Sequence, residues 1–152
     1  MNEAALVINP RETGFIPLDF RELFGNDNPV ILEIGSGKGR FLIASATEQP
    51  ERNFIGIEKS LHYHRVIRDR VLKRNLANVR LINHDAFLVM QKMFAGASVA
   101  EVHIYFPDPW PRKREQKRSA EKCVRQRDQH VRRQIVRNSN RPKQLGRRVT
   151  DQ

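Results

Sequence analysis

The stretch PVILEIGSGKG, residues 29–39, joins an aliphatic run to a turn with a glycine at every second position. Its first seven residues predict a buried strand, because the run is short and aliphatic and the glycines stop it. Gly35, Gly37 and Gly39 lack side chains, so a ligand could approach the backbone there and the N-terminus of a helix predicted over residues 41–49. This strand, turn and helix decide the fold class.

Strand patterns and helix patterns alternate after this turn. Strands are predicted over residues 53–58, 78–86 and 99–106, with helices over residues 63–75 and 87–94 between them. Strands that alternate with helices form βαβ units, and therefore a parallel sheet with right-handed crossovers. The sequence thus predicts an α/β fold.

Acidic residues follow the first three predicted strands, at the sheet edge where ligands bind in such folds. The glycine spacing is G-x-G-x-G, unlike the G-x-G-x-x-G of a dinucleotide site, and Glu33 would repel a pyrophosphate but attract an amino group. Glu58 ends the second strand, where a carboxylate can accept both hydroxyls of a ribose. Asp85 could accept a hydrogen bond from an adenine amino group. Together they suit adenosine with a cationic amino-acid tail, which describes S-adenosylmethionine (SAM).

Each feature also has a purely structural interpretation. The glycines can form an ordinary turn, and Glu58 and Asp85 alone are typical of solvated strand ends. His62 and His64 read as surface histidines, because no Cys or acidic cluster nearby completes a metal site. The joint order of glycines and acids favours the cofactor interpretation, and no metal site is predicted.

The nine residues FPDPWPRKR, residues 106–114, follow the fourth predicted strand. Proline on both sides holds Asp108 in a stiff, non-helical turn. Its carboxylate could accept hydrogen bonds from the N1–H and amino group of a guanine, while Trp110 offers a flat face to a base. The basic residues 112–118 could contact phosphates. The alternative is a rigid proline turn followed by a solvated charge run.

The excess charge lies in the last quarter of the chain. The 152 residues carry a net charge of +11, yet residues 1–111 hold 13 Lys and Arg against 13 Asp and Glu. Residues 112–152 hold 15 Lys and Arg against 4 Asp and Glu.

A chain of this length has room for one domain, and no apolar run approaches membrane-spanning length. Cys123 is the single cysteine, which together with the lack of a signal-peptide pattern favours a reducing, cytoplasmic compartment.

The segments LEIGSGKGRF, FIGIE, NHDA and FPDPWPRKR resemble the bacterial tRNA (guanine-N7)-methyltransferase family over about residues 8–118. The resemblance implies a Rossmann-like class I methyltransferase fold, SAM as cofactor and tRNA as partner. N7 of guanine carries a lone pair and no proton, so the implied reaction needs positioning and no general base. By the same resemblance Asp108 is the active-site residue. The implied cofactor-binding residues are Glu33, Gly35, Gly37, Gly39, Glu58, Asp85 and Asp108, and the implied substrate- or RNA-binding residues are Arg112, Lys113, Arg114, Lys117 and Arg118.

The resemblance ends near Ser119. The family continues with an apolar helix, further strands and a T-x-x-E motif, whereas residues 119–152 are basic and poor in apolar residues. We expect residues 1–118 to form an incomplete methyltransferase domain without the C-terminal strands, and residues 119–152 to form a tail that is partly helical or disordered. A truncated or frame-shifted enzyme with impaired activity is the corresponding expectation.

Three functional classes stay open from the residues. The first is a SAM-dependent tRNA methyltransferase, and the second is a non-catalytic RNA-binding remnant that holds nucleic acid through its basic tail. The third, a dinucleotide-dependent oxidoreductase, is disfavoured by the glycine spacing. The sequence does not indicate which oligomeric state the protein has.

Overall fold

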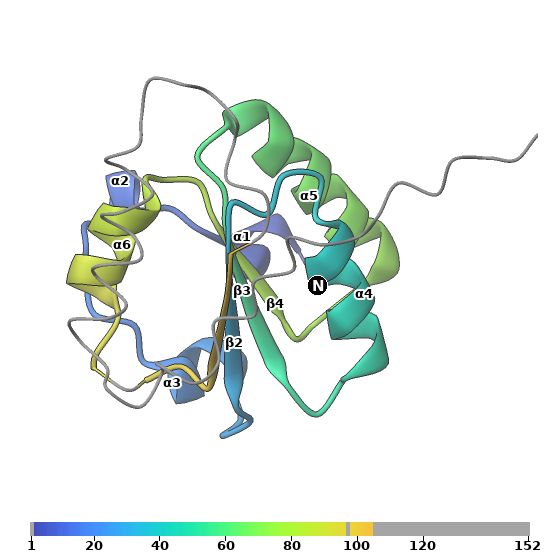
Figure 1. Cartoon of the computed structure of the whole chain (residues 1–152), viewed down its shortest axis with the longest axis horizontal. Coiled ribbons are helices and arrows are strands. Elements are labelled where there is room, and N and C mark those ends of the chain that lie inside the picture. Colours follow the sequence, from blue (N-terminus) through green and yellow to red (C-terminus); the bar gives the residue numbers. More distant parts are fainter. Residues whose placement is uncertain (1, 97, 105–152) are drawn as a thin grey trace, which may run out of the picture.

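A computed structural model describes residues 2–96 and 98–104 of the chain (Figure 1). Five strands form one sheet in the order β1-β4-β3-β2-β5, and every neighbouring pair is parallel. The parallel α/β fold predicted from the sequence is confirmed. The strands are β1 (Val7–Ile8), β2 (Val30–Ile34), β3 (Asn53–Ile57), β4 (Val79–Ile82) and β5 (Glu101–Ile104).

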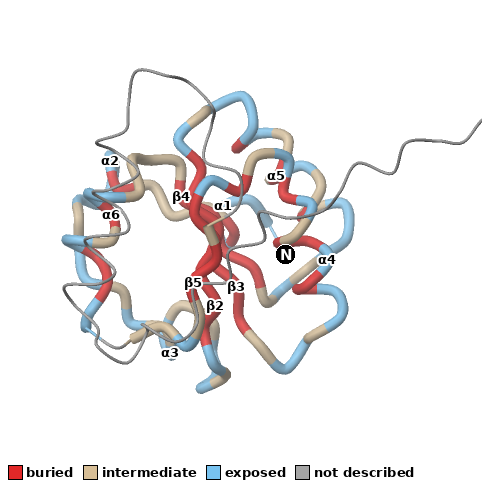
Figure 2. The backbone as a smooth tube through the Cα atoms, in the orientation of Figure 1, coloured by how far each residue is buried: buried red, intermediate tan, exposed pale blue. Residues whose placement is uncertain are grey.

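Helices cover both faces of the sheet (Figure 1). One face carries α1 (Glu3–Leu6), α4 (Arg40–Glu48) and α5 (Leu61–Arg74). The other carries α3 (Phe20–Phe24) and α6 (Ala86–Met93), with α2 (Pro10–Thr13) beside α6. The strands between these layers are largely buried (Figure 2). Two apolar cores result, one on each face of the sheet.

Alternate residues of each strand enter these two cores. On β2, Leu32 packs toward α6 and Ile31 packs toward α4 and α5. Phe54 of β3 joins Ile31, and Ile55 joins Leu32. Both faces of a parallel sheet are covered by helices, so its strands read as continuous aliphatic runs.

Strand β2 lies at the point where the chain order of the sheet reverses. Its neighbour on one side is β3, next in the chain, while β5 lies on its other side. The register aligns Glu33 with Gly56 of β3 and with His103 of β5. Ligands of open α/β sheets bind beyond the carboxyl ends of the strands at such a point. The carboxyl end of β2 leads directly into the glycine turn.

The predicted boundaries differ from the structure mainly after the third predicted strand. The strand predicted over residues 78–86 is β4, which ends at Ile82, and α6 begins four residues later at Ala86. Helices α1, α2 and α3 and strand β1 were not predicted, because each has only two to five residues. Strand β5 is described as far as Ile104, so the end of the strand predicted over residues 99–106 lies outside the described residues.

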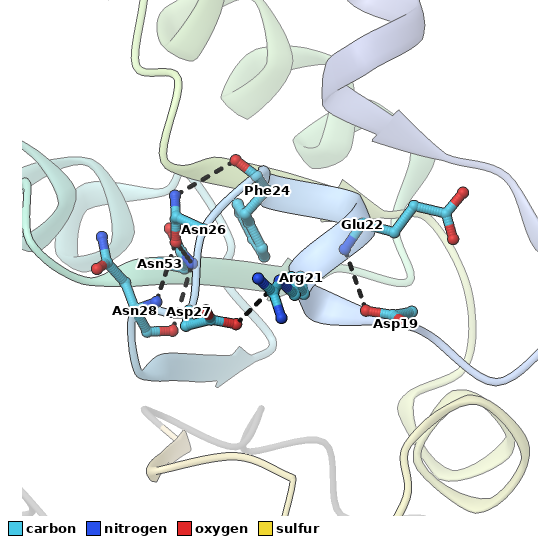
Figure 3. Close-up of polar contacts among 8 residues, drawn as sticks. All are labelled: Asp19, Arg21, Glu22, Phe24, Asn26, Asp27, Asn28 and Asn53. Carbon is cyan, nitrogen blue, oxygen red and sulfur yellow. Dashed lines mark hydrogen bonds and ion pairs between the residues drawn. The ribbon is translucent and has the colours of Figure 1, made fainter.

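The segment that leads into β2 is fixed to the amino end of β3 (Figure 3). The buried side chain of Asn53 donates to Asn26 Oδ1 at 2.7 Å and to the carbonyl of Asn28 at 3.4 Å. At the start of α3, Asp19 accepts from the N–H of Glu22 at 3.0 Å. These bonds lie at the amino edge of the sheet, opposite the glycine turn. They give β2 a fixed starting point.

A buried arginine connects α3 to the sheet. Arg80 of β4 donates to the carbonyl of Leu23 at 2.7 Å, and its guanidinium lies 4.7 Å from the centre of the Phe24 ring. Burial lowers the pKa of Arg80.

No helix in the described part of the chain is long and apolar enough to cross a membrane.

Candidate functional site

The glycine turn adopts a backbone that favours glycine at all three of its glycines. Gly35, Gly37 and Gly39 have φ angles of 72°, 54° and 69°. A side chain at Gly35 or Gly37 would meet no atom within 4 Å, whereas one at Gly39 would approach Ile67 of α5 to 2.9 Å. The first two glycines therefore leave open space beside the backbone, and the third allows α4 to pack closely against α5.

Glu58 connects the end of β3 to this turn. Its carboxylate accepts from the N–H of Gly37 at 2.8 Å and from the N–H of Ser60 at 2.7 Å. The side chain is buried. An ionised carboxylate offers about four acceptor positions, so it can accept further hydrogen bonds while it holds both N–H groups.

Asp85 follows β4 and caps α6. Its carboxylate accepts from the N–H of Phe87 at 3.0 Å and forms an ion pair with Lys59 at 2.9 Å. Partial burial would raise the pKa of Asp85, but the charge and hydrogen bond of Lys59, together with the N–H groups at the start of α6, lower it below its ordinary value. Asp85 is therefore ionised at neutral pH.

Asn83 joins the carboxyl ends of β3 and β4. Its side-chain amide donates to the carbonyl of Glu58 at 2.8 Å and to that of Lys59 at 3.2 Å. A continuous line of polar contacts thus runs along the carboxyl edge of the sheet from Gly37 through Glu58 to Asp85. Asn83 and Lys59 were not predicted as site residues, and the sequence carries no separate signal for them.

Glu33 is the most buried acid of the group. Its side chain belongs to β2, is 3% exposed, and has one oxygen, Oε2, with no hydrogen-bond partner among the described residues. The hydroxyl of Ser36, in the glycine turn, is also buried and lies next to the Glu33 carboxyl group. Burial raises the pKa of Glu33 from an ordinary 4.5 to about 7. Hydrogen bonds from the Ser36 hydroxyl and the Leu42 N–H oppose this rise, and the charge of Glu58 adds a little to it. Among the buried side-chain atoms that lack a partner in the described residues, Glu33 Oε2 is the carboxylate oxygen, so it can accept a hydrogen bond from a ligand.

Gly56 explains how Glu33 and Ser36 come close to α4. Gly56 is aligned with Glu33 on β3, and a side chain there would approach Leu42 to 2.7 Å and Ser36 Oγ to 3.0 Å. The missing side chain lets the turn and the first residues of α4 lie against the sheet. This glycine was not singled out from the sequence, because a single glycine in a strand has several explanations.

The structure thus brings together Glu33, the three glycines, Glu58 and Asp85 at one edge of the sheet, as predicted. Asp108, Trp110, Arg112, Lys113, Arg114, Lys117 and Arg118 lie outside the described residues, as does the boundary predicted at residues 118 and 119.

The interpretation of His64 as a surface histidine was wrong. His64 is 5% exposed, because it lies on the stripe of α5 that packs against the sheet, with Ile67 and Val71. His62 is exposed, as expected. Among residues 2–96 and 98–104, no group of three His, Cys, Asp or Glu is placed to hold a metal ion.

Residues 27–132 of the chain match the protein family described as "Putative methyltransferase". A tRNA (guanine-N(7)-)-methyltransferase from Nitrosomonas eutropha is 45% identical over 102 residues, which are 67% of this chain and 46% of that protein. One from Listeria monocytogenes is 43% identical over 106 residues, 67% of this chain and 49% of that protein. The chain thus spans about half the length of these curated relatives.

The fold has a match among solved structures. A precorrin-6y C5,15-methyltransferase from Geobacter metallireducens GS-15 superposes with a TM-score of 0.53 at 20% identity, covering 67% of this chain and 50% of that one. At this identity the likeness concerns the fold alone. The family match, in contrast, covers more than half of the chain and includes the glycine turn and the three acids. The chain therefore belongs to the tRNA (guanine-N7)-methyltransferase family.

Proposed function

We propose that this chain binds SAM at the carboxyl edge of its sheet and transfers the methyl group to N7 of a guanine in tRNA. One observation carries the cofactor part of the proposal. The buried oxygen Oε2 of Glu33 has no partner among the described residues, and Glu33 lies near the end of β2, just before the open glycine turn. The names of the sequence relatives support the reaction and the substrate.

The residues of this edge fit SAM in their chemistry. Glu33 would bind the ammonium of the amino-acid tail, because a buried carboxylate gains most from a cationic partner. Glu58 would accept hydrogen bonds from the ribose hydroxyls while it holds the turn. Asp85, ionised and capping α6, would accept from the adenine amino group. Gly35 and Gly37 would leave room for the cofactor against the backbone.

The charge of the site favours this ligand over a dinucleotide. Glu33, Glu58 and Asp85 bring three carboxyl groups to the ends of three neighbouring strands. A pyrophosphate would be repelled there, whereas a cationic tail is attracted. This arrangement argues against the oxidoreductase interpretation.

The protein's proposed contribution to the reaction is to position the methyl group of SAM and N7 of guanine relative to each other. SAM supplies an activated methyl group, and N7 of guanine is already a nucleophile, so no residue needs to remove a proton from it. We propose that Asp108 orients the purine through its N1–H and amino group. Arg112, Lys113, Arg114, Lys117 and Arg118 would contact the tRNA, and a cytoplasmic location follows from that substrate.

A methyl-transfer assay tests the proposal. The full 152-residue chain is incubated with radiolabelled SAM and an unmodified tRNA transcript, with a full-length relative as the positive control. Label at N7 of guanine that disappears in Asp108→Ala supports the function. Binding of SAM without transfer, under conditions in which the control is active, would refute turnover by this chain.

The second candidate is RNA binding without turnover. The observation in its favour is the charge of residues 112–152, with 15 Lys and Arg against 4 Asp and Glu. A salt-sensitive affinity for tRNA that Asp108→Ala leaves unchanged, in a chain without transfer activity, would favour this candidate.

A further inference from the structure

Five cations come from the glycine turn and from the helices α4 and α5. All belong either to the glycine turn and the start of α4 or to the second half of α5. We call this group the α4–α5 basic surface. It consists of Lys38, Arg40, Arg70, Lys73 and Arg74.

Hydrogen bonds fix part of this surface to the glycine turn. The guanidinium of Arg70 donates to the carbonyl of Lys38 at 2.7 Å, and that of Arg74 donates to the carbonyl of Arg70 at 3.2 Å. A guanidinium has five N–H donors, so both arginines can still bind an anion. Lys73 and Arg74 are exposed. The second half of α5 is therefore tied to the turn that precedes α4.

None of these five cations forms an ion pair with a carboxylate of the described residues. Other cations of the same part of the chain do: Arg68 pairs with Glu3 and Asp69, and Arg52 pairs with Glu101 at 2.7 Å. Helix α5 carries five cations and one acid, although residues 1–111 are neutral in total. Positive charge is thus concentrated on α5.

Lys73 and Arg74 suit the last turn of α5, where cations favour the helix dipole, but other placements in this group are unfavourable. Arg70 and Arg74 are four residues apart on one helix, and like charges at that spacing are destabilising. Arg40 is the first residue of α4, where a cation opposes the helix dipole. Stability of the fold alone therefore does not explain the placement of Arg40.

We propose that the α4–α5 basic surface binds backbone phosphates of the RNA substrate. The proposal rests on the proposed function, which supplies the RNA, and it adds a second contact region to residues 112–118. Charge complementarity identifies the partner, because arginine binds phosphate oxygens with two parallel N–H groups and lysine adds a point charge. Lys38 lies in the glycine turn itself, so RNA held at the carboxyl edge of the sheet would lie next to this surface.

The test neutralises two cations that have no side-chain partner in the described structure, in the double variant Arg40→Gln/Lys73→Gln. The control double variant is Arg11→Gln/Arg21→Gln, which removes the same charge from α2 and α3 on the other face of the sheet. The association constant of an unmodified tRNA transcript is measured for each full chain at several salt concentrations. SAM affinity and the unfolding temperature are measured in parallel.

We expect Arg40→Gln/Lys73→Gln to weaken RNA binding at low salt, roughly tenfold for each phosphate that the variant no longer neutralises. The salt slope should fall by about one for each such phosphate. SAM affinity should stay unchanged, and the control should bind RNA as the wild type does.

Equal decreases in RNA affinity in both double variants, or no decrease in either, would overturn the proposal while SAM binding still supports the proposed function. A chain that binds neither RNA nor SAM would overturn both. Weaker binding to phosphatidylglycerol vesicles with unchanged RNA binding would assign the surface to a membrane and also overturn the proposal.

Discussion

The carboxylate of Glu58 accepts a hydrogen bond from the backbone N–H of Gly37 at 2.8 Å, although the two residues are 21 positions apart. This bond ties the end of β3 to the turn after β2. The acid that would bind the ribose therefore also fixes the turn that would receive the cofactor. The proposed cofactor binding and the local structure would therefore depend on the same side chain.

Glu58→Gln should lower both the stability of the fold and the affinity for SAM. The amide retains one acceptor oxygen, so one of the two partly buried N–H groups bound by Glu58, from Gly37 or Ser60, loses its partner. We expect the free energy of unfolding to fall by about 1–3 kcal/mol, together with a higher dissociation constant for SAM. Urea unfolding and calorimetry measure the two effects. Glu48→Gln, an exposed change on α4, is the control, and equal behaviour of the two variants would contradict the role of Glu58.

Gly39→Ala and Gly25→Ala form a matched pair. Both glycines have left-handed backbone angles, φ 69° and ψ 25° for Gly39 and φ 72° and ψ 19° for Gly25. A side chain at Gly25 meets nothing within 4 Å, whereas one at Gly39 approaches Ile67 to 2.9 Å. Gly25→Ala should therefore cost about 1–2 kcal/mol of stability from backbone strain, and Gly39→Ala about 1–3 kcal/mol more from overpacking. Similar unfolding midpoints for the two variants would show that α4 and α5 are not closely packed at Gly39.

The stability of the protein should depend on the ionisation of Glu33. Burial raises its pKa from 4.5 to about 7, so between these values the folded protein holds a proton that the unfolded chain releases. The free energy of unfolding therefore falls as the pH rises through this window, by up to about 3 kcal/mol. Above about pH 7 this contribution no longer changes. Urea unfolding across the window should show the slope in the wild type and a smaller slope in Glu33→Gln; an identical slope in both would contradict the assignment.

Protonation of His64 should change the free energy of unfolding in the direction opposite to that of Glu33, at lower pH. Burial, with the positive charge of Arg68 as a smaller cause, lowers its pKa below 6.5. Below pH 6.5 the unfolded chain binds a proton that the folded protein binds less readily, so stability is lost as the pH falls. His64→Leu should reduce this acid-side slope. His62→Leu changes an exposed histidine of the same helix and should leave the slope as it is. A reduced slope in His62→Leu with an unchanged slope in His64→Leu would contradict the assignment to His64.

The parts of the fold that the sequence could predict are those with a strong local pattern. Strands β2 and β3 are continuous aliphatic runs, and α5 shows a helical stripe, so each was predicted within two residues of its bounds. Helices α1, α2 and α3 are too short for a periodic pattern to emerge. The third predicted strand was too long, because Asp85 reads equally well as the end of a strand and as the cap of a helix.

The candidate site was predictable where glycines and acids follow strands in order. The common placement of Glu33, Glu58 and Asp85 was predicted in this way, because parallel strands bring their carboxyl ends to one edge. The supporting residues were not, since the roles of Ser36, Lys59 and Asn83 depend on contacts between separate loops. The burial of His64 was missed for a different reason: His64 lies three residues before Ile67, at the end of the apolar stripe of α5, and a polar residue at that place can be buried or exposed.

Titration of the full chain with SAM at different pH values tests the central claim most directly. If the buried Glu33 carboxylate binds the cationic tail of SAM, it must be ionised, and the affinity should rise about tenfold between one pH unit below and one pH unit above its pKa of about 7. Glu33→Gln should bind SAM more weakly and with little pH dependence. No binding by the wild type, or equal affinity and equal pH dependence in the two proteins, would contradict the account.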